Sequence, residues 1–197
     1  MIGLVALVIA YLLGAIPVGF LLVKFSTGKD VRASGSKNIG ATNVLRTTSR
    51  MLGLVTLALD IGKGYLAVWI AGMLTGDSPF WTSAAALAVI AGHAYPLFLG
   101  FKGGKAMASF IGAFLYLTPL PLLAALVVFV AVVAKTRYIS AGSMIAAGSF
   151  PVAVWLISHP PADVLLAAFI AAVFIVYRHK SNLARIREGK EFIFEWK

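Results

Sequence analysis

Residues 1–22 read MIGLVALVIAYLLGAIPVGFLL, a stretch in which no side chain carries a charge. A helix needs about 20 mostly apolar residues to cross the hydrocarbon core of a membrane, and this stretch is long enough. It lacks the basic leader region of a secretory signal peptide, and no small-residue cleavage site follows it. We therefore expect a first transmembrane helix that is retained in the protein.

The rest of the chain has the same apolar character. Of its 197 residues, 60% are hydrophobic and 12% are charged, whereas soluble domains carry about 25% charged residues. The length predicts a single membrane-embedded domain, residues 1–197. The apolar segments are Ile2–Phe25, Met51–Leu74, Phe80–Leu99, Ala106–Leu117, Pro119–Ala134, Ile139–Ile157 and Val164–Tyr177. The predicted fold class is all-α, a polytopic membrane protein with seven transmembrane helices.

Charge distribution predicts the orientation of these helices. All 17 Lys and Arg residues fall in alternate connections, if Lys63 is counted as lying one or two turns into the second helix. Cytoplasmic loops are enriched in Lys and Arg, which places the N-terminus outside and the C-terminus in the cytoplasm. The alternative is six spans and one re-entrant segment, because Ala106–Leu117 is short and bounded by Pro119 and Pro121. Six spans would put one basic loop on the wrong side, so the alternation favours seven.

Composition also excludes several kinds of chemistry. The absence of cysteine excludes disulfides, thiolate metal sites and a cysteine nucleophile. The three histidines are far apart in the sequence, and we expect neither a metal nor another cofactor. A net charge of +10 would suggest nucleic acid in a soluble protein. In a membrane protein it is better explained by orientation and by phosphorylated substrates, so no nucleic-acid partner is expected.

The first of three polar runs is SGSKNIGATNVLR, residues 34–46. Glycine permits the positive-φ turns that direct successive backbone N–H groups at one anion. The Ser and Thr hydroxyls can donate as well, and the run contains two cations. The alternative is a flexible, solvated loop that caps the second helix.

The second run is GHAYPLFLGFKGGK, residues 92–105. Gly103 and Gly104, between Lys102 and Lys105, resemble a phosphate cradle in which lysine acts as a mobile point charge. The spacing is not that of a Walker A loop. The alternative is that both lysines only determine topology.

The third run is RHKSNLAR, residues 178–185. His179 and Asn182 share a face if the last helix continues through them, and Arg185 lies about two turns beyond Arg178 on nearly the same face. The alternative is an ordinary basic stretch that binds anionic lipid. Three such runs on one membrane face indicate a site for more than one phosphate.

One pair of charges lies inside a predicted span. Asp60 and Lys63 are separated by three residues, which allows them to pair on one helix face. Charged groups inside a membrane helix are costly and are usually paired or functional. We expect a structural pair that can also orient residues of the site.

Together the three runs resemble the acyl-phosphate-dependent glycerol-3-phosphate acyltransferase family of small bacterial membrane proteins. The resemblance covers essentially the whole chain and implies seven helices with the site on the cytoplasmic side of the inner membrane. It implies catalytic roles for Ser36, Arg46, Lys105, His179 and Asn182. Further residues expected to bind substrate are Ser34, Gly35, Asn38, Gly40, Thr42, Asn43, Lys102, Gly103, Gly104, Ser143, Arg178 and Arg185. Membrane lipid is an expected partner, as is a functional link to the enzyme that makes acyl phosphate.

Two positions depart from the family's pattern. Lys37 and Ala106 stand where the family usually has glycine. If either backbone must adopt a positive φ, a residue with a Cβ costs about 1 kcal/mol or more.

The implied reaction moves a fatty acyl group from acyl phosphate to the sn-1 hydroxyl of glycerol 3-phosphate, giving lysophosphatidic acid and phosphate. Two phosphorylated substrates repel each other by several kcal/mol at about 4–6 Å, and cations can offset this repulsion. We expect the first run to bind the acyl phosphate head, and Lys105 and Arg46 to neutralise phosphate. We expect His179 and Asn182 to orient glycerol 3-phosphate. The proton acceptor is either His179 or, in the favoured interpretation, a substrate phosphate.

Two other functions were weighed. A transporter of a small organic phosphate fits the basic clusters, but no inverted repeat is evident and the outer loops lack cations. A CDP-alcohol phosphotransferase needs several Asp residues to hold Mg²⁺, and the sequence contains no cluster of Asp residues.

Overall fold

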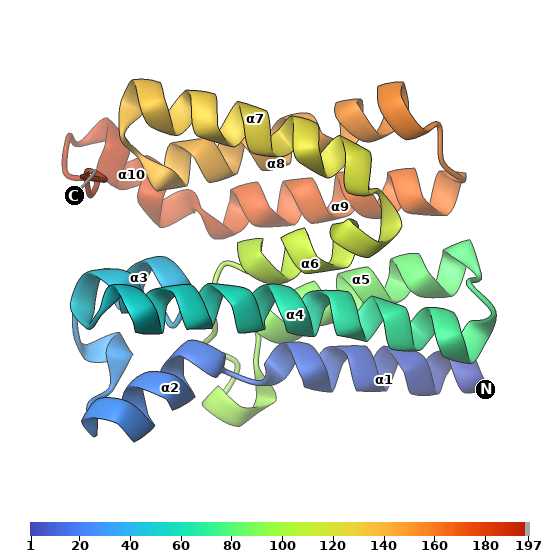
Figure 1. The fold of residues 1–197 in the computed structure, drawn as a ribbon, viewed down its shortest axis with the longest axis horizontal. Coiled ribbons are helices and arrows are strands. Elements are labelled where there is room, and N and C mark those ends of the chain that lie inside the picture. Colours follow the sequence, from blue (N-terminus) through green and yellow to red (C-terminus); the bar gives the residue numbers. More distant parts are fainter. Residues whose placement is uncertain (196–197) are drawn as a thin grey trace. The chain divides into compact units, whose positions relative to one another are not determined.

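The computed structural model describes residues 1–195, and every regular element in that range is helical (Figure 1). The elements are α1 (Ile2–Ala15), α2 (Val18–Thr27), the 3₁₀ helix η1 (Val31–Ala33), α3 (Ala41–Thr47), α4 (Arg50–Thr75), α5 (Pro79–Ala94), the 3₁₀ helix η2 (Leu97–Leu99), α6 (Met107–Leu117), α7 (Pro119–Thr136), α8 (Ile139–Ser158), α9 (Ala162–Arg178) and α10 (Lys180–Arg187). The all-α prediction is confirmed for the described residues.

Each of the seven predicted apolar segments is helical. Five stretches are long and apolar enough to cross a membrane, namely Ile2–Thr27, Arg50–Thr75, Pro79–Leu99, Pro119–Thr136 and Ile139–Ser158. A sixth is obtained if α9 and α10, which are bent by 49° at their junction, form one span. Helix α6 has only 11 residues. The number seven and the orientation of the termini therefore stay predictions.

The chain divides into two compact units, Met1–Leu117 and Thr118–Lys197. The first contains α1 to α6 with the first two polar runs, and the second contains α7 to α10 with the third. The single domain expected over residues 1–197 stays a prediction.

Small residues let the helices of the first unit approach closely. Helix α4 packs against α1, α5 and α6, and α1 packs against α5. A Cβ on Gly64 of α4 would collide with the carbonyl oxygen of Ser109 on α6, and one on Gly112 would collide with that of Ile61. Close backbone approach of this kind is typical of helix pairs in membranes, where small residues form the contact.

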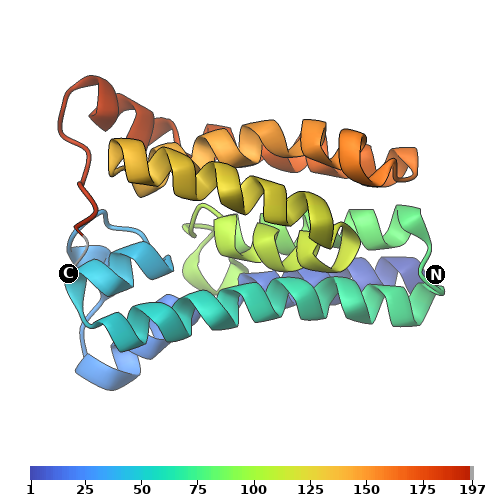
Figure 2. The same cartoon turned by 45° about the horizontal axis from the view of Figure 1, so that its top comes forward.

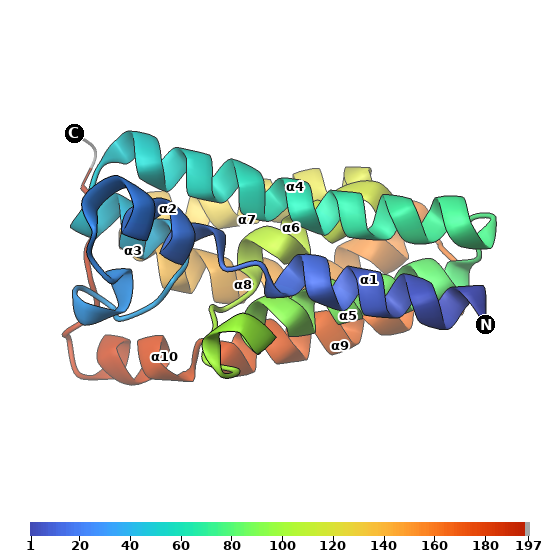
Figure 3. The ribbon, with the colours of Figure 1, turned by 90° about the horizontal axis from the view of Figure 1, so that it is seen from below.

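A break divides the first apolar segment at Ile16 and Pro17, and Figure 3 shows the short connection between α1 and α2. Proline has no backbone N–H and cannot continue the ladder of α1. Lys63 of α4 donates from Nζ to the carbonyl oxygen of Ile16 at 2.7 Å. Lys63 is itself paired with Asp60 at 2.8 Å, which confirms the pairing predicted from their spacing.

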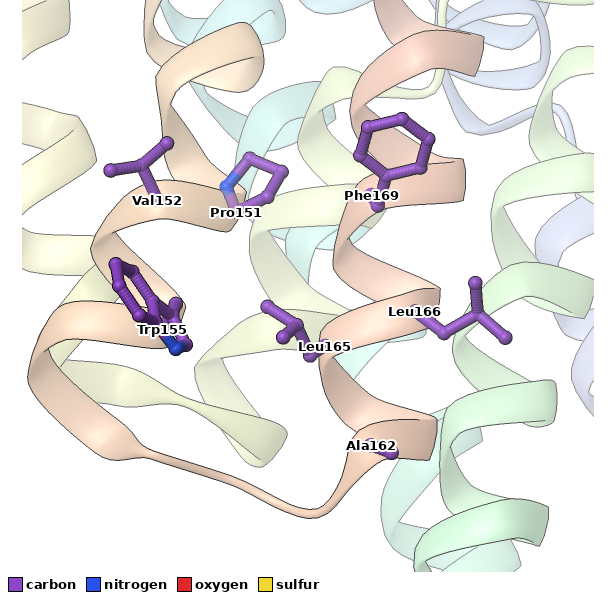
Figure 4. A pocket seen from close by; sticks show the side chains of 7 residues that line it. All are labelled: Pro151, Val152, Trp155, Ala162, Leu165, Leu166 and Phe169. Atoms are coloured by element: carbon purple, nitrogen blue, oxygen red, sulfur yellow. The ribbon is translucent and has the colours of Figure 1, made fainter.

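The second unit is built on α8, which packs against α7 on one side and α9 on another. Helix α10 leaves the direction of α9 and contacts both α8 and α9 (Figure 2). An apolar groove of about 450 Å³ lies between α8 and α9 (Figure 4). It is lined by Pro151, Val152, Trp155, Ala162, Leu165, Leu166 and Phe169. None of the three polar runs contributes a side chain to this lining.

The close approach of α4 and α6 gives a first prediction. Replacing Gly64 with alanine forces the two backbones apart, and overpacking of this kind typically costs about 1–3 kcal/mol. Gly62→Ala is the matched control on the same helix, because a Cβ there meets no atom within 4 Å. Thermal unfolding of the purified protein in detergent should show a lower midpoint for Gly64→Ala only. Equal midpoints for the two variants would contradict the packing described for α4 and α6.

Candidate functional site

The first polar run is preceded by a charged turn. The Asp30 carboxylate accepts a hydrogen bond from the backbone N–H of Arg32 at 2.9 Å and forms an ion pair with its guanidinium at 2.8 Å. Hydrogen bonds from the side chain and backbone of Arg32 lower the pKa of Asp30 below its usual value. The guanidinium also lies over the ring of Phe20, 4.9 Å from its centre. This turn fixes the chain where α2 gives way to the run.

A small apolar core lies beneath the first run. Val23, Val31, Ile39 and Val44 are buried against one another, with Phe20, Leu52 and Leu99 packed around them. The run contains one ordered element, α3, which packs on α4, and η1 directly precedes the run. The alternative of a flexible, solvated loop is wrong, because Ile39 and Val44 of the run are removed from water.

Asn43 holds the first run in shape. Its side chain is buried, and its Nδ2 donates to the carbonyl oxygens of Val31, Ser34 and Asn38 at 3.0, 3.2 and 2.9 Å. Its Oδ1 accepts from the backbone N–H of Ser36 at 2.8 Å. An amide has two N–H hydrogens, so the three carbonyl oxygens share them, and both ends of this side chain are bonded to backbone in or next to the run. These bonds give Asn43 a role in shaping the run, while its expected contact with substrate stays a prediction.

The other expected residues of this run lie around Asn43. Asn38 Oδ1 accepts from the N–H of Gly40 at 2.8 Å, and Gly40 precedes the first turn of α3. Thr42 and Arg46 are exposed one turn apart on α3, which places them on the same face. Ser34 and Gly35 are exposed and Ser36 is half-buried.

The second run folds back onto the end of α5. The N–H of Gly103 donates to the carbonyl oxygen of Ala94 at 3.2 Å, and that of Gly104 donates to that of His93 at 3.1 Å. Their hydrogens thus satisfy carbonyls at the end of a helix, and the expectation that these two glycines bind phosphate stays a prediction. The glycines also allow close approach, since a Cβ on Gly104 would collide with the His93 ring.

The structure brings the first two runs together. The position of a Cβ on Gly104 lies 3.5 Å from Asn38 Oδ1 and against Nε2 of His93. Gly104 is buried, Lys105 is half-buried, and Lys102 is exposed. The predicted proximity of the two runs is thus found within the first unit.

A buried polar cluster, formed by Asp60, Lys63, His93 and Ser109, supports this meeting point from α4, α5 and α6. His93 Nδ1 lies 3.0 Å from Ser109 Oγ and 3.6 Å from Asp60 Oδ1. Ser109 Oγ also donates to the carbonyl oxygen of Asp60 at 3.2 Å. Sequence analysis assigned no role to His93 or Ser109. His93 belongs to the second run, whereas Ser109 is an ordinary small residue of an apolar helix and gives no signal.

In the second unit the third run is organised by Glu191. This buried carboxylate accepts from Asn182 Nδ2 at 2.8 Å and Ser140 Oγ at 3.0 Å through Oε1, and from Arg185 Nε at 2.8 Å through Oε2. Sequence analysis missed Glu191, whose position in a charged tail did not distinguish it. Ser143, expected to bind substrate, is buried one turn beyond Ser140 on α8.

His179 lies at the bend between α9 and α10 and is buried. The two helices are not continuous, so the condition on which His179 and Asn182 would share one helix face is not met. Both side chains are nevertheless buried, and the backbone N–H of Asn182 donates to the His179 carbonyl oxygen at 2.8 Å. His179 Nδ1 lies 2.8 Å from the carbonyl oxygen of Ile175, which can only accept, so Nδ1 carries the hydrogen. Arg178 is half-buried beside this bend.

Within residues 1–195, no three His, Cys, Asp or Glu side chains gather in a way that could hold a metal ion. The described polar runs carry cations, hydroxyls, amides and histidines. These groups bind anions, donate hydrogen bonds to developing negative charge and orient hydroxyl groups.

Residues 4–189 match the protein family described as glycerol-3-phosphate acyltransferase. A protein of that name from Geobacter sulfurreducens is 46% identical over 98% of this chain and 97% of its own length. Another from Geotalea daltonii is 44% identical over 98% and 97% of the two chains. A crystal structure of PlsY (YgiH), an integral membrane glycerol 3-phosphate acyltransferase in its glycerol 3-phosphate form, is 35% identical. It covers 98% of this chain and 96% of its own, with a TM-score of 0.92. Its lysophosphatidic acid form is also similar, with a TM-score of 0.89.

Glu191 and Glu188 give a matched pair of substitutions. Glu191→Ala leaves three buried or half-buried donors without their acceptor. The free energy of unfolding should fall by about 2 kcal/mol or more. Among residues 1–195 the Glu188 carboxylate pairs with Lys190 alone, and both side chains are mostly exposed, so Glu188→Ala should change stability by less than about 1 kcal/mol. Thermal unfolding in detergent measures both. A Glu191→Ala midpoint equal to that of Glu188→Ala would contradict the organising role of Glu191.

The two departures from the family's pattern have a measurable consequence. Lys37 and Ala106 have φ values of 57° and 61°, in the region that favours glycine. The expected strain is therefore present at both positions. Lys37→Gly should raise the free energy of unfolding by about 0.5–1 kcal/mol, because Lys37 is exposed and loses no packing. Lys29→Gly, at an exposed position without positive φ, is the control and should not stabilise. Destabilisation by Lys37→Gly in thermal unfolding would show that the strain is absent.

Proposed function

We propose that this chain, which belongs to the glycerol-3-phosphate acyltransferase family, transfers a fatty acyl group from acyl phosphate to the sn-1 hydroxyl of glycerol 3-phosphate. The products are lysophosphatidic acid and inorganic phosphate. The meeting of the first two polar runs at Gly104, Asn38 and His93 is the observation that carries the proposal. It draws together the segments that bear Lys105, Lys102 and Arg46, and so provides positive charge for a phosphorylated donor.

Charge is the main requirement of this reaction. Acyl phosphate is already activated, with phosphate as its leaving group, but it must approach a second phosphorylated substrate. Each phosphate monoester carries about −1.5 to −2 charge near neutral pH. Lys105 and Arg46 neutralise the donor phosphate and stabilise the negative charge that develops on the carbonyl oxygen. Ser36, held by Asn43, donates to the same phosphate.

The acceptor is oriented by the third run. Asn182 Oδ1 is buried and has no hydrogen-bond partner in the described part of the chain, while Nδ2 is held by Glu191. A buried acceptor without a donor costs about 1–3 kcal/mol, and a glycerol hydroxyl supplies such a donor. PlsY in its glycerol 3-phosphate and lysophosphatidic acid forms supports this acceptor and this product.

In the chemical step, the sn-1 oxygen attacks the carbonyl carbon of acyl phosphate. The bond between that carbon and the phosphate oxygen breaks, and phosphate leaves with the bonding electrons. The hydroxyl proton passes to a substrate phosphate, whose second pKa is about 6. His179, whose Nδ1–H is held by Ile175, is the alternative acceptor through Nε2.

The proposed setting is the bacterial inner membrane. A site on the cytoplasmic side is supported by its basic connections, because Lys and Arg are enriched in cytoplasmic loops. There, soluble glycerol 3-phosphate can enter while the acyl chain of the donor remains among membrane lipid. A functional link to the enzyme that makes acyl phosphate follows from the need for this donor.

The deciding assay uses the purified protein in lipid cubic phase with palmitoyl phosphate and glycerol 3-phosphate, without added metal. Phosphate release should need both substrates and yield lysophosphatidic acid. Lys105→Ala should lower kcat/KM by about 10²-fold or more, and the exposed Lys29→Ala should not. Phosphate release that does not depend on glycerol 3-phosphate, or a folded protein without turnover, would contradict the proposal. Transport of glycerol 3-phosphate into liposomes would then be the next assay.

A His179→Ala variant that keeps kcat but binds glycerol 3-phosphate weakly would identify the substrate phosphate as proton acceptor.

A further inference from the structure

His93 contacts both ends of the short segment that carries Lys105. At one end the His93 carbonyl oxygen accepts from the N–H of Gly104 at 3.1 Å, and its ring lies against Gly104. At the other end His93 Nδ1 lies 3.0 Å from Oγ of Ser109, in the first turn of α6. Lys105 directly follows Gly104, so one buried side chain fixes the backbone on both sides of this lysine.

The neighbours of His93 also determine which ring nitrogen carries hydrogen. Ser109 has a single hydroxyl hydrogen, which it gives to the carbonyl oxygen of Asp60 at 3.2 Å. Ser109 Oγ must therefore accept from His93, which places the hydrogen on Nδ1. The Asp60 carboxylate, 3.6 Å from Nδ1, favours the same arrangement. In this orientation Nε2 is the nitrogen that lies against Gly104.

The His93 ring lies next to a buried ion pair whose displacement would cost free energy. Asp60 is 2% exposed and forms an ion pair with Lys63 at 2.8 Å. Lys63 is anchored in turn on the carbonyl oxygen of Ile16, at the break between α1 and α2. Displacing His93 would disturb charges in a region of low dielectric, where such changes are costly. The ring is therefore held in one orientation from two other helices.

We propose that His93 is a positioning residue for acyl transfer, which acts by fixing the segment Gly104–Ser109 and thereby the place of Lys105. Ser109 and Asp60 orient the His93 ring for this purpose. The proposal rests on the proposed function, in which Lys105 stabilises phosphate and developing charge. It also explains why glycine stands at position 104, since the ring occupies the space of a Cβ.

Kinetics of three variants test this role. Ser109→Ala removes the acceptor of the Nδ1 hydrogen, and His93→Ala removes the support altogether. Both should lower kcat/KM by about 10–100-fold, because small displacements of a catalytic group have effects of this size. The loss should lie mainly in kcat, since Lys105 acts on developing charge. His93→Asn should restore part of the rate, because its amide donates near the position of Nδ1.

Ser83→Ala is the matched control, a buried serine of α5 whose Oγ has no hydrogen-bond partner among residues 1–195. It should leave kcat/KM unchanged. A purely structural role for His93 would lower the unfolding midpoint while the folded fraction kept the wild-type kcat, and that result would overturn the proposal. So would a Ser109→Ala variant with wild-type kinetics.

Acetylation of lysine separates this proposal from the proposed function, because it needs no turnover. Mass spectrometry of partly acetylated protein should show Lys105 reacting several-fold faster in His93→Ala than in the wild type. Lys102, which is exposed, serves as the internal reference and should not change. If the wild type fails to use acyl phosphate but Lys105 responds in this way, the reaction proposed above is wrong and the positioning role stands. If Lys105 labelling is unchanged, the positioning role is overturned even in an active enzyme.

Discussion

The buried ion pair between Asp60 and Lys63 is the constraint around which the first unit is arranged. A charge inside a membrane helix is costly unless it is paired and hydrogen-bonded. Here each charge has more than one partner: Lys63 contacts Asp60 and the Ile16 carbonyl oxygen, and the Asp60 carboxylate also faces His93. The pair therefore links the break in the first apolar segment to the helix from which the second polar run emerges.

The two polar runs of this unit are held next to the ion pair. In the second run Gly104 lies against the His93 ring, and the first run approaches the second at Gly104 through Asn38. The first run has its own support in two features of different kinds. An apolar core beneath it supplies the driving force for burial, and the amide of Asn43 sets the path of the backbone above that core. A loop rich in Gly, Ser and Asn is thus held in one conformation without a regular ladder of hydrogen bonds.

In the second unit, one carboxylate holds the third polar run in place. Glu191 gathers an amide, a hydroxyl and a guanidinium from α8 and α10. It satisfies Nδ2 of Asn182 and leaves Oδ1 of the same side chain buried without a protein donor in the described residues. A side chain held at one end and unsatisfied at the other is suited to binding a ligand hydroxyl, because the cost of orienting it is met before the ligand arrives.

The sequence by itself determined the apolar segments, the all-α class and the alternation of basic connections, because these depend on composition along the chain. It also determined the pairing of Asp60 with Lys63, since three residues along a helix bring side chains to one face. Strain at Lys37 and Ala106 was predicted only on the condition of a positive φ, and the structure supplied that torsion angle. Only the tertiary structure decided that Gly103 and Gly104 give their amides to the end of α5, that Asn43 shapes the first run, and that His93, Ser109 and Glu191 support the site. The contacts His93–Ser109, Asp60–Ser109 and Ser140–Glu191 join residues that are 16, 49 and 51 positions apart. No local pattern encodes them, because they depend on which helices pack together and on where the absence of a Cβ lets two backbones meet.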